Sequence, residues 1–159
     1  MLTVMGTVAV CISAVGLGVS YAHSLKRQRD SITALLSLCE RIRMRIECFR
    51  QPLPDIYEDF DDDRLDAQFL YDLKESGLSY ALTKNRRRLS LSPELYGSLC
   101  SFSSELGKSY AEGQIRLCHE CILVLKGAIA ELEAKLPSRV RLSLTLSAAT
   151  AAMAAILFL

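Results

Sequence analysis

The distribution of charge along the chain constrains its fold more than any other sequence feature. All 19 Lys and Arg residues and all 18 Asp and Glu residues lie between Lys26 and Arg141. Residues 1–25 and 142–159 therefore carry no charge, although the formal net charge of the 159-residue chain is only +1. Such a chain has a polar middle and two apolar ends, and the ends have to be kept away from water.

Both uncharged ends are candidate membrane spans. A transmembrane helix needs about 20 mostly apolar residues, because each residue advances the helix by about 1.5 Å across about 30 Å of hydrocarbon. Residues 2–25 satisfy this length. The uncharged residues 142–159 lie near its lower limit and are rich in Ala, Ser and Thr, and the span that contains them is placed at 140–159. The disfavoured alternative is that the N-terminal apolar run is a signal peptide and the middle segment is a secreted domain. No Lys or Arg precedes Lys26, and the apolar run is too long for a signal peptide. We therefore expect two spans and, between them, a domain at 26–138.

Basic residues flank both spans on the side of the middle segment. Lys26, Arg27 and Arg29 follow the first span, and Arg139 and Arg141 lie at the start of the second. Basic flanks stay on the cytoplasmic side of a membrane. The sequence thus predicts a multi-pass membrane protein with a cytoplasmic central domain and both termini outside. In that compartment the six cysteines are expected to be reduced.

Two long stretches of the chain repeat apolar residues mainly at steps of three and four, the spacing of one buried helix face. Pro52 and Pro54 end the first helix near "RQPLP", because the residue before a proline is pushed out of the α region. Pro137 interrupts the second helix and is expected to kink it as it continues into the final span. The two stripes are Leu25, Ile32, Leu35, Cys39, Ile42, Ile46 and Phe49, and Ile115, Cys118, Ile122, Leu125, Ile129, Leu132 and Leu136.

Shorter helices are predicted between the two long ones. Apolar residues at helical steps indicate a helix around residues 53–60 and another from Leu65 to Gly77, and residues 83–92 are expected to form a polar connection. The predicted fold class is all-α: a helical bundle built on two long antiparallel helices with short covering helices. This bundle is flanked by an N-terminal and a C-terminal transmembrane helix.

Three stretches carry helix-terminus signals. "SPEL" predicts a helix start with Ser92 as N-cap and Pro93 at the first helical position. Gly107 suits the C-terminal cap of the same helix. Ser109, with Glu112 three residues later, has the spacing of a capping box at the start of the last helix.

The "CHEC" stretch at Cys118–Cys121 is the most evident candidate for chemistry. Cys118 falls on the apolar stripe, and the pair lies inside a predicted helix instead of at its start, where the helix terminus lowers a thiol pKa. A structural zinc site needs four ligands, and only one pair of thiols is adjacent here. Core packing is therefore the preferred interpretation. The alternative function is a small membrane thiol- or zinc-binding protein that uses Cys118 and Cys121.

Acidic residues concentrate between Asp55 and Asp66. The run lacks the spaced ligands, the central Gly and the terminal Glu of a calcium loop, so a solvated loop or a face for a basic partner is the better interpretation. The candidate partner surface combines Asp59 and Asp62 of this run with Arg41 and Arg45 of the first long helix.

The remaining candidate residues are three consecutive arginines and two histidines, and they do not indicate an enzyme. Arg86–Arg88 are candidates for contact with anionic lipid headgroups, or else form a solvated loop. Only His23 and His119 are present among histidines, and no phosphate-binding loop, nucleophile elbow or zinc-protease motif occurs. Near-zero net charge gives no bulk attraction to nucleic acid. We expect a scaffold without cofactor, metal or nucleic-acid partner.

The sequence resembles the stage III sporulation protein AB family of endospore-forming bacteria over nearly its whole length. The matching stretches are "GLGVSYAHSLKRQR", "PLPDI", "SPELYGSLCSFSSELGKSYAEGQ", "AELEAKLPSRVRL" and the apolar end. The most specific piece runs from Leu106 and Gly107 to Gln114. Tyr110 departs from the family, which usually has an acidic residue there. The family-motif residues are thus Pro52, Pro54, Ser92, Pro93, Leu106, Gly107, Gln114 and Pro137.

The resemblance implies a role in sporulation. The family is similar to the cytoplasmic domains of inner-membrane platform proteins of type II secretion and type IV pilus machines. A member is therefore expected to be a non-enzymatic component of the channel between mother cell and forespore, in the mother-cell membrane facing the forespore. Its implied partners are the cytoplasmic secretion-type ATPase of the same complex, other membrane proteins of the channel and the lipid bilayer.

Overall fold

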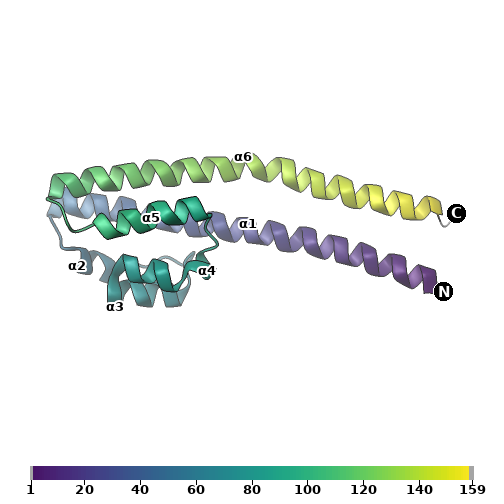
Figure 1. Ribbon diagram of the computed structural model, residues 1–159, viewed down its shortest axis with the longest axis horizontal. Coiled ribbons are helices and arrows are strands. Elements are labelled where there is room, and N and C mark those ends of the chain that lie inside the picture. The colour runs from purple at the N-terminus through teal and green to yellow at the C-terminus, as the bar shows by residue number, and fades with distance from the viewer. Residues whose placement is uncertain (1, 158–159) are drawn as a thin grey trace. The chain divides into compact units, whose positions relative to one another are not determined.

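The computed structural model of the chain is all-α, as the sequence predicted (Figure 1). The structure describes the backbone of residues 2–157 and the side chains of residues 24–134. Its helices are α1 (Leu2–Phe49), α2 (Leu53–Glu58), α3 (Ala67–Lys84), α4 (Arg86–Leu89), α5 (Pro93–Glu105) and α6 (Ala111–Leu157).

The chain divides into two compact units. One comprises residues 1–26 and 131–159, and the other, which we call the bundle, is Arg27–Ala130. Apart from Ser24 and Leu25, the predicted spans at 2–25 and 140–159 lie outside the described side chains. Among the residues that are described, no helix is long and apolar enough to cross a membrane.

Within the bundle, α1 and α6 lie side by side and antiparallel (Figure 1). Cys39 Sγ of α1 lies 3.7 Å from Cys121 Sγ of α6. Beside this contact, Lys126 Nζ lies 3.0 Å from Glu40 Oε1. These contacts and the opposite directions of α1 and α6 in Figure 1 confirm the predicted pairing of two long antiparallel helices.

The predicted apolar stripes supply the core of this helix pair. Burying one such side chain contributes about 1.5–3 kcal/mol, so the stripes are a major source of stability. Not every stripe residue is buried: Leu25, Ile115, Ile129 and Leu132 are half-buried, and Phe49 is 68% exposed. Phe49 lies at the end of the stripe. It is the last residue of α1, and the chain turns away at Arg50, whose φ is 49°. The buried stripe residues are Ile32, Leu35, Cys39, Ile42 and Ile46 of α1 and Cys118, Ile122 and Leu125 of α6.

The short helices cover the long pair, and α3 packs against both α2 and α5. Their apolar sides complete the core of the bundle. The buried residues are Ile56 and Tyr57 of α2, Phe69, Leu73, Leu78, Ala81 and Leu82 of α3, Leu89 of α4, and Leu95, Leu99 and Phe102 of α5.

Helix α3 extends beyond the end that the sequence predicted. Gly77 has φ 80° and ψ 176°, which interrupts the helix, but helical structure resumes and continues to Lys84. The expectation of a polar connection over 83–92 is wrong in its first half, because α4 follows directly at Arg86. The reason is that Leu82 and Leu89 are buried and hold this stretch against the bundle. Glycine allows the change of direction without a loop.

Helix α5 has the termini that the sequence predicted. Ser92 Oγ accepts a hydrogen bond from the Leu95 amide at 3.3 Å, and Pro93 is the first helical residue. Leu106 caps the C-terminal end, and Gly107 follows with φ 89°, a left-handed conformation that glycine adopts without strain.

Helix α6 begins differently from the prediction. Its first residue is Ala111, one residue later than a Ser109 N-cap requires. Instead, the backbone oxygen of Ser109 accepts a hydrogen bond from Gln114 Nε2 at 2.8 Å. Pro137 lies within the bounds of α6, among the residues whose side chains are not described.

Candidate interaction surface

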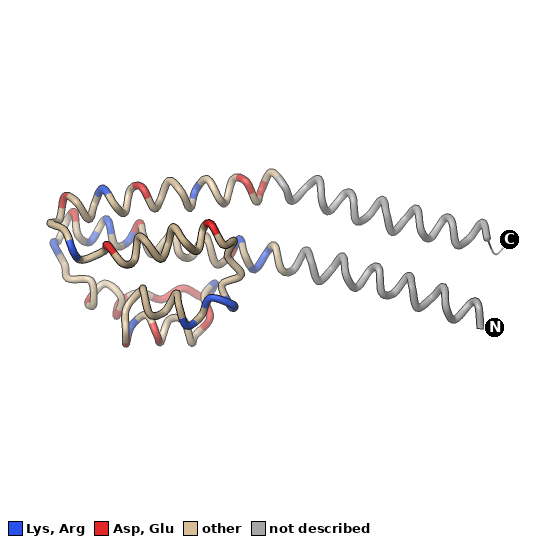
Figure 2. Tube along the Cα trace, viewed as in Figure 1, with Lys and Arg blue, Asp and Glu red and all other residues tan. Residues whose placement is uncertain are grey.

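Residues 55–66, which we call the acidic segment, comprise most of α2 and the loop that leads to α3 (Figure 2). Helix α1 holds this segment through two arginines. Arg41 Nη1 donates to the backbone oxygen of Asp59 at 2.7 Å, and its guanidinium lies 5.8 Å from the centre of the Phe60 ring. Arg45 Nη2 lies 3.5 Å from Asp59 Oδ2, and Arg45 Nη1 donates to Gln51 Oε1 at 3.0 Å. The structure therefore brings Arg41, Arg45 and Asp59 together.

The side chain of Asp62 points towards α1 and not towards solvent. Its side chain is 9% exposed and accepts hydrogen bonds from Ser37 Oγ at 3.1 Å and from Arg64 Nη2 at 2.6 Å. Arg64 Nε adds a bond of 2.8 Å to the other carboxylate oxygen. The bonds from Arg64 hold the pKa of Asp62 below its usual value. Asp62 thus fastens the segment to α1.

Four other carboxylates of the acidic segment face solvent. Because neighbouring residues fix the backbone of the segment, these carboxylates are presented at defined positions and form a negative surface. They are Asp55, Glu58, Asp61 and Asp63, and none of them forms an ion pair or a side-chain hydrogen bond with the described part of the chain.

A buried polar cluster around Asp72 was missed by the sequence analysis. Asp72, only 1% exposed, accepts hydrogen bonds from Lys84 Nζ at 2.8 Å, Asn85 Nδ2 at 2.8 Å and Gln68 Nε2 at 3.1 Å. The bond from Lys84 is the main reason that the pKa of Asp72 is lowered. One sequence feature could have indicated this cluster: Asp72 lies three residues after Phe69 and therefore on the apolar side of the same helix. The cluster joins the two halves of α3 and has a structural role.

The thiols of the "CHEC" stretch belong to the core. Cys118 is fully buried, and burial raises its pKa to about 12. The Cys121 thiol is paired with Cys39, whose pKa the shared hydrogen bond and burial also raise. Cys39 and Cys118 therefore stay protonated near neutral pH and are poor nucleophiles or metal ligands, whereas the hydrogen bond with Cys39 lowers the pKa of Cys121. Within the described residues, no group of three or more candidate ligands is arranged for a metal ion.

Several family-motif residues meet at one end of the bundle. A cavity of about 350 Å³ is lined by Pro52 and Pro54 from the turn after α1 and by Gly107 and Gln114 from the stretch around the start of α6. Tyr110, where this chain departs from the family, is 94% exposed. The two sequence stretches are therefore neighbours in space. The structure places Ser92 and Pro93 apart from this cavity, at the start of α5.

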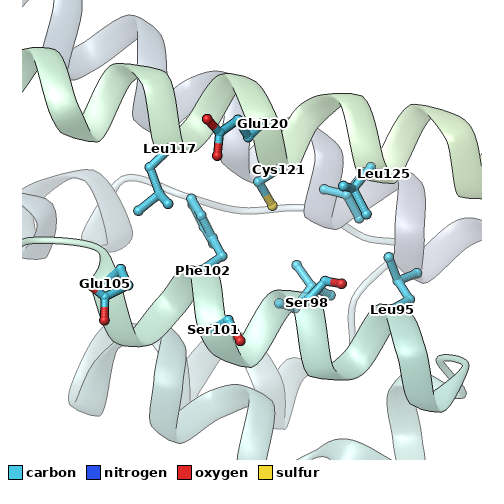
Figure 3. Close-up of a pocket in the computed structure, with 11 residues that line it drawn as sticks. Leu95, Ser98, Ser101, Phe102, Glu105, Leu117, Glu120, Cys121 and Leu125 are labelled. Atoms are coloured by element: carbon cyan, nitrogen blue, oxygen red, sulfur yellow. The ribbon is translucent and has the colours of Figure 1, made fainter.

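Helices α5 and α6 enclose a second, apolar cavity of about 220 Å³ (Figure 3). Phe102 of α5 and Leu117 and Leu125 of α6 contribute apolar walls, and Glu105 and Glu120 are the acidic lining residues. Val124, also in the lining, is 46% exposed. The cavity can accept an apolar side chain but carries no catalytic constellation.

Comparison with known proteins identifies the family of the chain. The family model of stage III sporulation protein AB matches residues 3–159, which is nearly the whole sequence. No curated protein and no solved structure matches the chain. The family is a sporulation family whose members are generally non-enzymatic parts of a channel complex. The chain therefore belongs to the stage III sporulation protein AB family.

Proposed function

We propose that the chain is a membrane-anchored, non-enzymatic platform of the mother cell–forespore channel complex and docks the cytoplasmic secretion-type ATPase of that complex. Residues 2–25 and 140–159 anchor it in the mother-cell membrane that faces the forespore. Residues 26–138 form the cytoplasmic domain, and both termini lie outside. Its further partners are the other membrane proteins of the channel.

Sequence and fold support the anchoring. Both ends lack charge, and basic residues flank each end on the side of the bundle. Because α1 and α6 pair in antiparallel fashion, Arg27 and Ala130 lie towards the same end of the bundle. One anchor precedes Arg27 in sequence and the other follows Ala130, which suits a domain tied twice to one membrane.

The observation that carries ATPase docking is the ordered acidic segment. Arg41, Arg45 and Arg64 bind Asp59 and Asp62, which fixes the segment, while Asp55, Glu58 and Asp61 remain exposed. A fixed negative surface attracts a positive face of a partner and accelerates its association. We assign that positive face to the ATPase.

The test is co-isolation of the ATPase with this chain from membranes of sporulating cells. The triple variant Asp55→Asn, Glu58→Gln, Asp61→Asn removes three exposed charges without touching the hydrogen bonds of Asp59 and Asp62. We expect it to recover much less ATPase than wild type, and more strongly so at low ionic strength. The matched control Glu94→Gln, Glu112→Gln, Glu120→Gln changes exposed carboxylates elsewhere. Equal recovery of ATPase with both variants would reject the acidic segment as the docking surface.

A further inference from the structure

A polar cavity of about 210 Å³ lies beside the first turns of α1 in the bundle. Its charged walls come from separate parts of the sequence: Arg27 from α1, the end of the acidic segment, and Arg88 from α4. Neither the sequence patterns nor the proposed docking surface explains why these groups converge. The lining residues are Arg27, Ser31, Asp63, Arg64, Leu65, Asp66, Phe69, Arg88 and Leu89.

Only some of these charges are neutralised within the bundle. Arg88 Nη1 pairs with Asp66 Oδ1 at 2.9 Å, and Arg64 pairs with Asp62. Arg27 and Asp63 form no ion pair and no side-chain hydrogen bond with any described residue. Among the described residues, Arg27 and Asp63 are thus the cation and the anion of the cavity without a hydrogen-bonded partner, and the charge of Arg27 helps to lower the pKa of Asp66. Arg88 also keeps further N–H donors, because a guanidinium carries five.

Ser31 adds a hydroxyl to the same cavity. Its side chain is only 5% exposed and forms no hydrogen bond with a described residue. Its oxygen is not fully buried, however, because Arg43 Nε is the one buried side-chain nitrogen or oxygen without a partner among the described residues. Neighbouring hydroxyls on α1 behave differently: Thr33 donates to the backbone oxygen of Arg29 at 2.8 Å, and Ser37 to that of Ala34 at 2.9 Å. The Ser31 hydroxyl lines the cavity and is therefore available to donate a hydrogen bond to a ligand there.

We propose that this cavity binds the phosphoethanolamine headgroup of a membrane lipid. The phosphate oxygens accept hydrogen bonds from Arg27, Arg88 and Ser31, and the ammonium group pairs with Asp63. Guanidinium groups suit phosphate because their N–H donors lie in one plane and match its oxygens. One water molecule needs a cavity of about 10–15 Å³. At about 210 Å³ this cavity is much larger and has room for several small groups.

The position of Arg27 favours a lipid as the source of this headgroup. Arg27 is the second residue after the predicted span at 2–25, so membrane anchoring places it at the level of the headgroups. The lipid source therefore rests on the proposed membrane anchoring. A bound headgroup would join α1, the acidic segment and α4 at the membrane surface.

The experiment uses the purified full-length chain in mixed micelles and counts retained lipids by native mass spectrometry. The probes are phosphatidylethanolamine, phosphatidylcholine and phosphatidylglycerol, each at the same mole fraction. Phosphatidylcholine keeps the phosphate but lacks N–H donors, and phosphatidylglycerol lacks the cation. We expect one phosphatidylethanolamine to be retained per chain in clear preference to the other two lipids.

Matched variants separate this site from general attraction to the membrane. Arg27→Ala is expected to weaken retention about tenfold, whereas Lys26→Ala, its exposed basic neighbour outside the cavity, has little effect. Ser31→Ala also weakens retention but leaves folding intact, since that hydroxyl has no partner to lose. Asp63→Asn removes the preference over phosphatidylglycerol, and the exposed Asp61→Asn preserves it.

Two results overturn the proposal. Equal retention of the three lipids contradicts a headgroup site, and an equal loss with Lys26→Ala and Arg27→Ala shows attraction by charge alone. A parallel titration with soluble phosphoethanolamine separates the two sources of the headgroup. If the soluble compound binds as tightly as the lipid, the lipid source is wrong and a soluble phosphate ester is the ligand. Because this titration needs no membrane, it distinguishes failure of the cavity from failure of the proposed anchoring or ATPase docking.

Discussion

Asn85 Nδ2 lies 2.8 Å from Asp72 Oδ2, and this bond connects the two sides of the kink at Gly77. Asn85 also donates to the backbone oxygen of Ala81 at 3.1 Å, and it is only 2% exposed. One side chain therefore caps the end of α3 and joins that end to the start of the same helix. The chain can change direction at Gly77 and still keep both halves of α3 in one position.

Replacing Asn85 tests this connection. Asn85→Ala is expected to lower the free energy of unfolding by about 1–3 kcal/mol, because a buried carboxylate loses one of its donors. Ser79→Ala, at an exposed position of α3, is the control and should change stability little. Both variants are compared with wild type by denaturant unfolding followed by circular dichroism. Equal stability of the Asn85 variant and wild type would contradict the connecting role.

The stability of the bundle should fall in acid because of its bound aspartates. The pKa of Asp62 is lowered mainly by Arg64, and the pKa of Asp72 mainly by Lys84. A carboxylate with a lowered pKa in the folded chain contributes stability above its unfolded pKa of about 3.9. That contribution is lost as the pH falls from this value through the lower folded pKa. We expect the free energy of unfolding to decline over that range, and to decline less steeply in Asp62→Asn. An unchanged slope in the variant would reject the contribution of Asp62.

Two glycines should respond to alanine in opposite ways. Gly77 has φ 80° and ψ 176°, a conformation that is nearly restricted to glycine, so Gly77→Ala should destabilise by about 1–3 kcal/mol. The nearest neighbour of an added Cβ is the Tyr57 ring at 3.8 Å, so the cause is backbone strain and not crowding. Gly97 lies inside α5 with nothing within 4 Å of an added Cβ, and Gly97→Ala should stabilise by about 0.5–1 kcal/mol. Thermal unfolding of both variants measures the two changes in melting temperature. Changes of the same sign in both variants would contradict the opposite roles of Gly77 and Gly97.

The cysteines should differ sharply in reactivity. Cys48 is exposed, whereas Cys39 and Cys118 are buried and have raised pKa values. Maleimide at neutral pH should therefore label Cys48 in the folded chain and Cys39 and Cys118 only after denaturation. Mass spectrometry of peptides from native and unfolded samples gives the comparison. Rapid labelling of Cys118 in the folded chain would restore the thiol or zinc alternative.

The elements that the sequence predicted well depend on local spacing. Steps of three and four residues correctly placed Ile32, Leu35 and Ile42 in the core of α1 and Cys118 and Ile122 in the core of α6. This works because a helix repeats every 3.6 residues, so spacing alone determines which residues share a face. The cap at Ser92 was equally local, since its partner is the amide of Leu95 three residues away.

The features that sequence could not supply depend on residues distant along the chain. Ser37 and Asp62 are 25 residues apart, and Arg41 and Asp59 are 18 apart. No local pattern predicts that Asp62 turns inward while Asp61 and Asp63 stay exposed. The polar cavity lined by Arg27, Asp63 and Arg88 could not be predicted for the same reason, because its walls come from three segments that only the folded chain brings together.

The contact between Arg41 and Asp59 should control the order of the acidic segment more than the stability of the bundle. Arg41→Ala removes the 2.7 Å hydrogen bond to the Asp59 backbone and the stacking on Phe60. Such partly exposed contacts contribute up to about 1 kcal/mol, so global unfolding should change little. Local opening of the segment needs less free energy once this contact is lost, and its amides should exchange hydrogen faster. Hydrogen exchange with mass spectrometry measures this, with Lys74→Ala at an exposed position of α3 as the control. Unchanged exchange over residues 55–66 in Arg41→Ala would show that other contacts order the segment, and faster exchange together with reduced recovery of the ATPase would connect that order to docking.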